Sequence, residues 1–334
     1  MEQPKILVIG VGGSGSNTIN RMKDIKIAGV TKIVINTDIQ HLEKVNSDKK
    51  ILIGKKTTRG FGAGSNPEVG EMAAREQEEE ITKEVENSDL VFITCGLGGG
   101  TGTGAAPVVA EICKNQGILT VGVVTLPFTS EGYVRRENAF KGLERLKKFT
   151  DTLIVVPNDK LLSIVPNLPL DNAFKVSDEV LARAVKGIAE LITLPGLINL
   201  DLADLKTVMK DGGYAMIGLG ESRIDTKREE RALIAAQTAL SSPLLDVDLS
   251  TVDRALINVV GGEDMTLKEA ELIPAEVCAR IHPQAHIIWG ARIEKEMKRS
   301  AIQTLLVLVG ASIPNYREMK KAEEIEEFEL GEVF

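Results

Sequence analysis

The chain has 334 residues, of which 43% are hydrophobic and 26% are charged, a composition typical of a folded protein large enough for two domains. Its formal net charge of −8 argues against a protein that binds nucleic acid through a general positive field, so an anionic ligand would need local hydrogen-bond donors. No apolar run approaches the ~18 residues needed to cross a bilayer, and the first residues lack a signal-peptide pattern, so we expect a soluble, cytoplasmic protein without membrane insertion.

Apolar runs alternate with helical or loop segments in the first half of the chain. They predict buried strands at 5–9, 32–35, 90–94, 119–125 and 152–156. This alternation is typical of a doubly wound, mostly parallel α/β sheet. The segment 71–86 mixes acidic and basic residues, which predicts a solvated helix.

A long amphipathic helix is predicted from 177 to 194, because apolar residues recur there at three- and four-residue spacing before Pro195 and Gly196. Beyond it, we predict strands at 207–209, 214–218, 256–260, 286–289 and 304–309, with helices near 227–240 and 267–278. Thr266 and Glu269 form a predicted capping box for the last helix. We therefore expect a first domain over 1–172, a connecting helix over 173–196, a second, smaller α/β domain over 197–315 and a charged tail over 316–334.

The segment Gly98–Gly104 holds five glycines and two threonines. It follows the predicted strand at 90–94 and precedes a predicted helix that starts near Ala105 and tolerates Pro107 in its first turn. Without side chains, backbone N–H groups can close on a ligand, and a helix N-terminus adds partial positive charge. The segment therefore predicts a phosphate site, and a packed glycine turn without a ligand is the alternative.

A second glycine loop follows the first predicted strand. Gly10, Gly12 and Gly15 match G-x-G-x-x-G, and Asp38 lies where a dinucleotide-binding fold places its ribose acid. Taken alone, this pattern would indicate NAD. A dinucleotide fold uses one glycine loop for its pyrophosphate, however, and two such loops on one sheet fit a triphosphate better.

A third segment, 60–68, precedes the charged helix. We expect it either to close over the outermost phosphate or to be a flexible loop capped by Asn66. The Walker motif G-x-x-x-x-G-K-[ST] is absent from the sequence. Backbone amides must therefore hold the phosphates. The three cysteines show no metal or disulfide spacing and are expected to be reduced and buried, and no metal ligands are predicted.

Taken together, these motifs resemble the tubulin and FtsZ family of polymerising GTPases. Gly98–Gly104 matches the family's glycine-rich signature, and the likeness reaches about Pro314 through 10–17, 62–68, 127–132, 157–160 and 199–204. The resemblance implies GTP or GDP as the ligand, with Mg²⁺ held mainly by phosphates and water. It also implies that the chain assembles head to tail with itself and acts at the division site.

The resemblance implies a set of nucleotide-binding residues. From the three glycine-rich segments these are Gly12, Gly13, Ser14, Gly15, Ser16, Asn17, Ala63, Gly64, Ser65, Asn66, Gly98, Gly99, Gly100, Thr101, Gly102 and Thr103. Glu131 and Arg135 would contact the nucleotide near the ribose and phosphates, although Arg135 would otherwise be a surface arginine.

The resemblance also assigns the recognition of guanine. Asn17, Asn158 and Asp178 would read the base, and Phe174 would pack on its ring. A carboxylate suits guanine, because its N1–H and N2–H₂ edge offers two donors that adenine lacks. Asp178 would otherwise be an acid in the first turn of a helix.

Two carboxylates three residues apart follow the long helix, within 196–204. From the residues alone, a turn and a capped helix explain them. In the family this loop is catalytic in trans, so Asp201 and Asp204 would position and polarise the water that attacks the next subunit's nucleotide, and Asn199 would contact the phosphates. Hydrolysis would then be activated by assembly.

Two other functions stay open at this point. One is a nucleotide-binding scaffold or regulator of the same fold with little hydrolysis, and the other is an NAD-dependent oxidoreductase. The sequence departs from the usual family pattern at Ser65, at Thr129 and Ser130, and over 248–254. It also lacks the long linker and apolar-basic peptide with which bacterial relatives bind membrane tethers, so docking to a membrane adaptor would fall to Phe328–Phe334.

Overall fold

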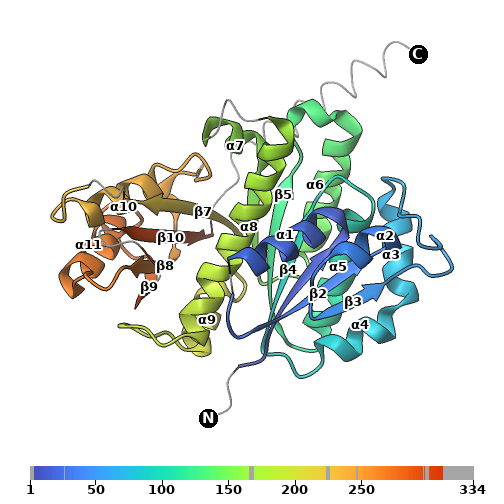
Figure 1. Cartoon of the computed structure of the whole chain (residues 1–334), viewed down its shortest axis with the longest axis horizontal. Coiled ribbons are helices and arrows are strands. Elements are labelled where there is room, and N and C mark those ends of the chain that lie inside the picture. The colour runs from blue at the N-terminus through green and yellow to red at the C-terminus, as the bar shows by residue number, and fades with distance from the viewer. Residues whose placement is uncertain are drawn as a thin grey trace.

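Among the residues that the structure describes, ten strands form one continuous sheet (Figure 1). The structure is a computed structural model that describes residues 4–25, 27–164, 169–222, 226–245, 247–295, 297 and 301–310. The strand order is β3-β2-β1-β4-β5-β6-β7-β10-β8-β9. The predicted charged tail and the segment Phe328–Phe334 lie outside the described residues.

The N-terminal half forms the parallel part of this sheet, as predicted. Its strands are β1 (Ile6–Val11), β2 (Val30–Asn36), β3 (Lys49–Leu52), β4 (Leu90–Gly96), β5 (Leu119–Leu126) and β6 (Thr152–Pro157). The sequence did not reveal β3, because this four-residue edge strand begins with two exposed lysines and has little apolar pattern.

Helices cover both faces of the parallel strands. One face packs on α1 (Gly12–Asp24), α2 (Ile39–Lys44), α7 (Asn158–Ile164), α8 (Leu170–Thr193) and α9 (Leu202–Met209). The other packs on α3 (Pro67–Glu76), α4 (Glu78–Val85), α5 (Thr101–Asn115) and α6 (Tyr133–Lys147). Alternate residues of β1 enter the two cores, which explains why its sequence is apolar throughout.

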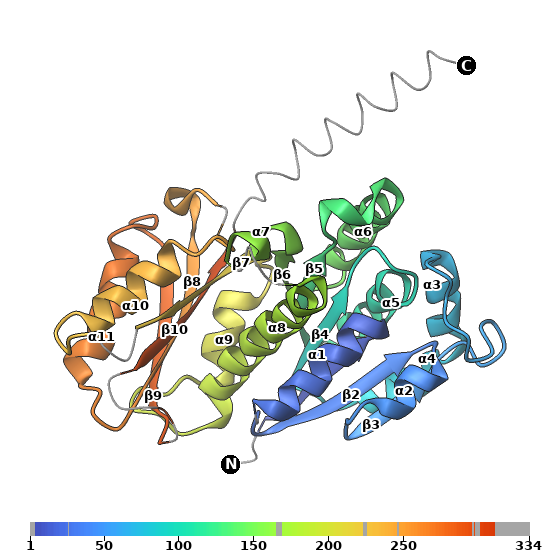
Figure 2. The same ribbon diagram turned by 45° about the horizontal axis from the view of Figure 1, so that its top comes forward.

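The C-terminal half continues the sheet with mixed strand directions. Its strands are β7 (Gly213–Glu221), β8 (Arg254–Gly261), β9 (His286–Ile293) and β10 (Ile302–Val309). Strand β10 runs antiparallel to β7 and β8, whereas β9 runs parallel to β8 and β7 is parallel to β6. The helices α10 (Arg231–Leu240) and α11 (Leu267–Cys278) cover one face, and α8 lies against the other (Figure 2).

Helix α8 crosses the molecule from one edge of the parallel sheet to the other. It follows β6 and α7, so it begins on the edge where the parallel strands end. Near its own end, Thr193 donates to the carbonyl of Ala28 at 3.3 Å, and Ala28 lies just before β2 begins. At 1.5 Å per residue, its 24 residues span about 36 Å. Among the described residues, no helix, α8 included, is long and apolar enough to cross a membrane.

Some predicted elements were wrong in type or bounds. The predicted strand at 207–209 is the end of α9, whose residues Leu205, Val208 and Met209 are buried at helical spacing. The predicted helix over 71–86 is two helices, α3 and α4, which meet at Gln77. The side chain of Gln77 accepts a hydrogen bond from Gly54 N at this break.

Helix boundaries also differ from the predicted ones. Helix α5 begins at Thr101, so part of the expected glycine loop is its first turn, and α8 begins at Leu170. Helix α10 begins at Arg231, whereas α11 has the predicted bounds and the Thr266 capping box. Cys95 and Cys113 are buried as expected, but Cys278 is exposed.

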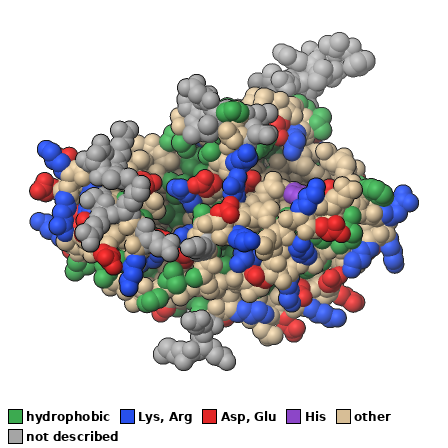
Figure 3. All heavy atoms as spheres, viewed as in Figure 1, with side chains coloured by type: hydrophobic (Ala, Val, Ile, Leu, Met, Phe, Trp, Pro, Cys, Tyr) green, Lys and Arg blue, Asp and Glu red, His purple; other side chains and the backbone are tan. Residues whose placement is uncertain are grey.

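Charged side chains of both signs are interspersed over the face that shows α1 and α8 (Figure 3). This face therefore presents no broad positive field to an anion. An anionic ligand would depend on local donors, as the net charge already indicated.

Helices α3 and α5 meet through glycine backbones. A Cβ atom on Gly104 would lie 1.9 Å from the carbonyl oxygen of Pro67, and one on Gly70 would lie 2.3 Å from the carbonyl oxygen of Gly100. These are backbone contacts that no side-chain rotation can relieve. The start of α3 is therefore held directly on the first turns of α5.

We expect Gly104→Ala to lower the free energy of unfolding by about 1–3 kcal/mol, despite the ~1 kcal/mol that alanine gains over glycine within a helix. Urea unfolding of the nucleotide-free protein measures this change. The matched control is Gly99→Ala, because a Cβ on Gly99 meets no atom within 4 Å. Equal stability of the two variants would contradict the backbone contact.

Candidate functional site

Three glycine-rich segments converge where the parallel strands end. A Cβ on Gly12, at the start of α1, would lie 2.8 Å from the amide nitrogen of Gly102 in α5. A Cβ on Gly100 would lie 2.8 Å from the Cβ of Ala63 and 2.9 Å from Asn66 N. The structure thus brings together the two predicted phosphate loops and the third segment.

The first turns of α1 and α5 have unused backbone donors. Neither N-terminus receives a side-chain cap, whereas Asn66 caps α3 by accepting from Glu68 N at 2.9 Å. The first N–H groups of a helix need a partner, and an anion is a suitable one. A Cβ on Gly99 would meet nothing within 4 Å, and one on Gly13 would meet only the His41 ring, at 3.5 Å. There is therefore open space beside both helix starts.

Several predicted binding residues hold the loops in place through their side chains. The buried Ser16 hydroxyl donates to Gly12 O at 2.6 Å, and the buried Thr103 hydroxyl accepts from Gly98 N at 2.8 Å. Thr101 shares a hydrogen bond of 2.7 Å with Thr37. Buried side chains such as Ser16 and Thr103 leave the backbone as the surface available to a ligand.

Sequence reasoning missed Thr37 and the role of His41. Thr37 directly follows β2 and is buried, and its position at the end of a parallel strand was the available signal. His41 in α2 lies beside Gly13 and bonds to the exposed Asn17 through Nε2 and Oδ1 at 3.2 Å. Asn17 therefore has a protein partner on the rim of the site.

The third segment lies over the glycine loops with strained backbone. Ser65 has a φ of 59°, a left-handed conformation that glycine adopts more easily. Ala63 is buried, whereas Gly64, Ser65 and Asn66 are exposed. Asn138 of α6 donates to Ser65 O at 3.4 Å. The segment is thus held at both Ala63 and Ser65.

Glu131 and Arg135 border the Gly98 turn. Their side chains form an ion pair of 3.1 Å, and Glu131 also accepts from Phe128 N at 2.8 Å. A Cβ on Gly98 would lie 2.7 Å from the carbonyl oxygen of Arg135. Arg135 is exposed, so its guanidinium remains accessible beside the loop.

Residues of α7 and α8 form another wall of the site. Asn158 and Asp178 are buried, and Asn158 Oδ1 accepts from the Ser177 hydroxyl at 2.9 Å. The half-exposed Phe174 ring meets the Phe128 ring edge to face, at 5.3 Å between centroids. Asp178 lies well inside α8, which begins at Leu170, so its interpretation as an acid of the first helical turn is wrong.

The Asp178 carboxyl has an unusual environment. Burial raises its pKa to about 7, while the charge of Arg21 and the hydroxyls of Thr18 and Ser14 only partly oppose this effect. Ser14 and Thr18 belong to α1, whose start is the first glycine loop. Asp178 is therefore a buried acid beside the predicted phosphate site.

The three predicted catalytic residues lie far from this site. They follow the end of α8, which is at the opposite edge of the sheet, beside Ala28. Along the helix, Asp178 and Thr193 are already about 22 Å apart at 1.5 Å per residue. The structure does not bring Asn199, Asp201 and Asp204 to the glycine loops of the same chain.

The two acids form a capping box at the start of α9. Asp201 Oδ1 accepts from Asp204 N at 2.8 Å, and Asp204 Oδ2 accepts from Asp201 N at 3.1 Å. Asn199 Oδ1 accepts from Gly196 N at 2.6 Å. The turn and capped helix inferred from the residues alone are thus confirmed. Each cap uses one oxygen of its carboxylate, so capping and a further role are compatible.

Comparison with known families matches both halves of the chain. Residues 5–166 match the family described as Tubulin/FtsZ family, GTPase domain. Residues 213–312 match the FtsZ family, C-terminal domain. The first match covers all three glycine-rich segments, and the second covers β7 to β10.

Individual proteins show the same likeness. The chain is 58% identical to Cell division protein FtsZ 1 of Thermococcus kodakarensis, over 99% of this chain and 86% of that protein. A solved structure of an empty FtsZ dimer from M. jannaschii is 58% identical, with a TM-score of 0.89 over 92% of this chain and 89% of that one. The GTPγS-bound protofilament structure of CetZ2 from Haloferax volcanii has a TM-score of 0.82 over 97% and 99% of the chains, but its 22% identity supports the fold alone.

We expect Asp178→Asn to stabilise the nucleotide-free protein at pH 8 but not at pH 4. The folded pKa of about 7 is above the ordinary aspartate value of 3.8, so the folded state retains a proton that the unfolded state releases between these values. Stability therefore falls as pH rises from 4 to 7, by roughly 4 kcal/mol for three pKa units. An asparagine at position 178 cannot ionise, so the variant does not lose this stability as the pH rises.

Urea unfolding at both pH values measures the difference. Asp248→Asn is the control, because hydrogen bonds from Ser250 lower the pKa of that exposed carboxyl and predict no gain at high pH. An Asp178→Asn variant with the same stability as the unmodified chain at pH 8 would refute a raised pKa.

Proposed function

This chain belongs to the tubulin/FtsZ family of GTPases, and we propose that it is a cell-division protein that assembles head to tail and hydrolyses GTP between neighbouring copies. The proposed pocket lies among the glycine-rich segments, Asn158, Phe174 and Asp178 of one copy. The proposed catalytic loop is the acidic loop over 196–204, which contains Asn199, Asp201 and Asp204 and belongs to the next copy.

A single observation supports this division of the site. Helix α8 places the glycine loops and the acidic loop at opposite edges of the sheet, at least about 22 Å apart along its axis. One chain cannot use its own acidic loop on a nucleotide in its own pocket. A second copy stacked edge to edge supplies it, and a contact between two different surfaces repeats into a filament.

Exposed apolar residues at both edges support such a contact. Phe61, which pairs with Asp38 near the glycine loops, is 84% exposed. Leu197, in the acidic loop, is 53% exposed. Large apolar side chains at both edges are suited to burial between copies.

The proposed chemistry relies on position more than on strong bases. Amides of α1 and α5 bind the phosphates, and Asp178 in its ionised form accepts from the guanine N1–H and N2–H₂ groups. Asp201 and Asp204 of the next copy orient a water molecule. The water oxygen forms a bond to the γ-phosphorus while the bond between the γ-phosphorus and the β–γ bridging oxygen breaks. The products are GDP and phosphate, with the water proton released to solvent.

Mg²⁺ would be held mainly by the phosphates and water. Among the described residues, no group of three or more His, Cys, Asp or Glu side chains could hold a metal. Such an ion would retain several waters and bind through phosphate oxygens, so it would need few protein ligands. When bound, it neutralises charge on the β- and γ-phosphates.

The alternatives now have less support. Asp38, on which the NAD hypothesis depended, caps α2 by accepting from His41 N at 3.0 Å, and the GTPase family match contradicts an oxidoreductase. A scaffold with little hydrolysis would use Asp201 and Asp204 only as a capping box. We propose that the protein acts in the cytoplasm and at the division site, and that any membrane adaptor binds the tail, which lies outside the described residues.

The trans arrangement predicts complementation between two inactive variants. Asp204→Asn retains an oxygen for the cap and should bind GTP normally, but its turnover should fall at least 100-fold, because the loop loses its charge. Asp178→Ala should lose GTP binding yet retain an intact loop. A mixture should regain turnover, because Asp178→Ala can supply its loop to GTP held by Asp204→Asn.

Phosphate release as a function of total protein, with light scattering alongside, measures this recovery. Asp201→Asn is the control for capping, since asparagine caps a helix as well as aspartate; it should be as stable as the unmodified chain and still lose turnover. A mixture as inactive as its two components would exclude hydrolysis in trans.

A further inference from the structure

The acidic loop is attached to the C-terminal half at one residue of β9. The amides of Leu197 and Ile198 donate to Ala291 O at 2.7 and 3.1 Å, and Ala291 N donates to Ile198 O at 3.2 Å. A Cβ on Gly196 would lie 2.6 Å from Ala291 O, so only glycine permits this approach. The position of the start of the loop, 196–198, therefore follows the position of Ala291.

The next residue of β9 joins the strand to α8. Side chains alternate along a strand, so Ala291 enters the core beneath α10 and α11 while Arg292 points to the other face. There Arg292 Nη2 contacts Glu190 Oε2 of α8 at 2.6 Å, with side chains only 10% and 3% exposed. One residue beyond the attachment point, β9 is thus fixed to the central helix.

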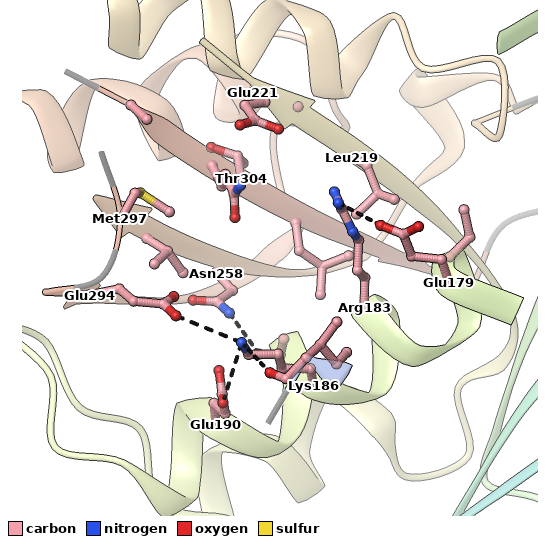
Figure 4. A pocket seen from close by; sticks show the side chains of 18 of the residues that line it. Glu179, Arg183, Lys186, Glu190, Leu219, Glu221, Asn258, Glu294, Met297 and Thr304 are labelled. Atoms are coloured by element: carbon pink, nitrogen blue, oxygen red, sulfur yellow. Dashed lines mark hydrogen bonds and ion pairs between the residues drawn. The ribbon is translucent and has the colours of Figure 1, made fainter. Parts of the chain in front are cut away.

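This ion pair lies in a cleft between α8 and the C-terminal half. The cleft has a volume of about 1550 Å³, and Glu190, Lys186 and Glu294 converge in it (Figure 4). Lys186 Nζ lies 3.9 Å from Glu190 Oε1 and 3.8 Å from Glu294 Oε1. Arg292 Nη2 also contacts Glu294 Oε2 at 3.1 Å. Arg292 thus reaches both acids, and it makes the closest contact with Glu190.

Burial makes the pair sensitive to the loss of either partner. Desolvation raises the pKa of Glu190 to about 7, opposed by the charges of Arg292 and Lys186. Removing Arg292 would leave a buried carboxylate with only the more distant Lys186. The carboxyl would then be protonated or would move toward water, and β9 would lose its fixed contact with α8.

We propose that the Glu190–Arg292 ion pair is a positioning element for hydrolysis, which sets the placement of the acidic loop that each copy presents to the next. The inference rests on the proposed function in trans. Neither residue touches the nucleotide, and both act through Ala291 and the loop attached to it. The same helix carries Asp178, about 18 Å before Glu190. The loop is therefore positioned relative to the helix that lines the chain's own pocket.

The test uses full-length Arg292→Met, which removes the charge but retains most of the side-chain length. Turnover at saturating protein should fall about tenfold or more, since a displacement of ~1 Å costs up to 100-fold. Affinity for GDP should change less than twofold, because the pocket is at the other edge of the sheet. Arg292→Lys should recover part of the turnover, because it restores a cation near Glu190.

Mixtures of Arg292→Met with other variants distinguish a misplaced loop from a general defect of the Arg292→Met chain. In a mixture with Asp178→Ala, the Arg292→Met pocket receives an intact loop and turnover should recover. In a mixture with Asp204→Asn, the Arg292→Met chain must supply the loop and turnover should stay low. Equal recovery in both mixtures would overturn the proposal.

Two further variants serve as controls. Arg231→Met removes another buried arginine of the C-terminal half, which pairs with Asp264 and Glu269 away from β9, and it should behave alike in both mixtures. The double variant Glu190→Gln/Arg292→Met removes the orphaned charge, so it should regain stability but not turnover. Full turnover of this double variant would refute the positioning role.

The two proposals fail in different ways. If Asp178→Ala and Asp204→Asn do not complement each other, hydrolysis in trans is wrong. If they complement each other but Arg292→Met behaves alike in both mixtures, only the positioning role is wrong.

Discussion

Direct contact between glycine backbones is the constraint on which the candidate site depends. Gly12 and Gly102 bring the two proposed phosphate loops together, and Gly104 and Gly70 hold the third segment against them. A side chain at Gly12, Gly104 or Gly70 would separate the elements that carry these loops. In this packing, the first amides of α1 and α5 have no side-chain caps, and open space lies beside them. The contacts that pack these helices therefore also place backbone amides where they are suited to an anion.

Helix α8 is the reason for proposing that this site is half of a larger one. It presents Asp178 at one edge of the sheet and ends at the acidic loop on the other edge. A rigid helix of this length prevents the two parts from meeting within one chain. Under the proposed division of the site, hydrolysis requires a second copy, and this would couple hydrolysis to assembly without any added regulatory element.

Two buried carboxyl groups of α8, Asp178 and Glu190, lower stability but occupy positions where a charge has a use. Burial leaves the ionised form of Asp178 poorly solvated and so raises its pKa, and burial in the cleft does the same to Glu190. Ordinary core residues would pack at lower cost. Carboxylates at these positions instead provide an acceptor beside the phosphate loops and a contact for Arg292 on β9.

The local sequence pattern by itself determined much of the fold of this protein. Strand alternation predicted the parallel sheet, the glycines predicted loops at the ends of β1 and β4, and Thr266 with Glu269 predicted the start of α11, because each depends on neighbours in sequence. The sequence pattern did not reveal the edge strand β3. The prediction of a strand at 207–209 was wrong, because a short apolar run does not show whether its residues are buried in a helix or in a strand. Only the tertiary structure decided that Thr37 meets Thr101, that Asp178 is buried beside α1, and that Arg292 reaches Glu190. These contacts join residues distant in sequence, and their geometry depends on how the elements pack around α8.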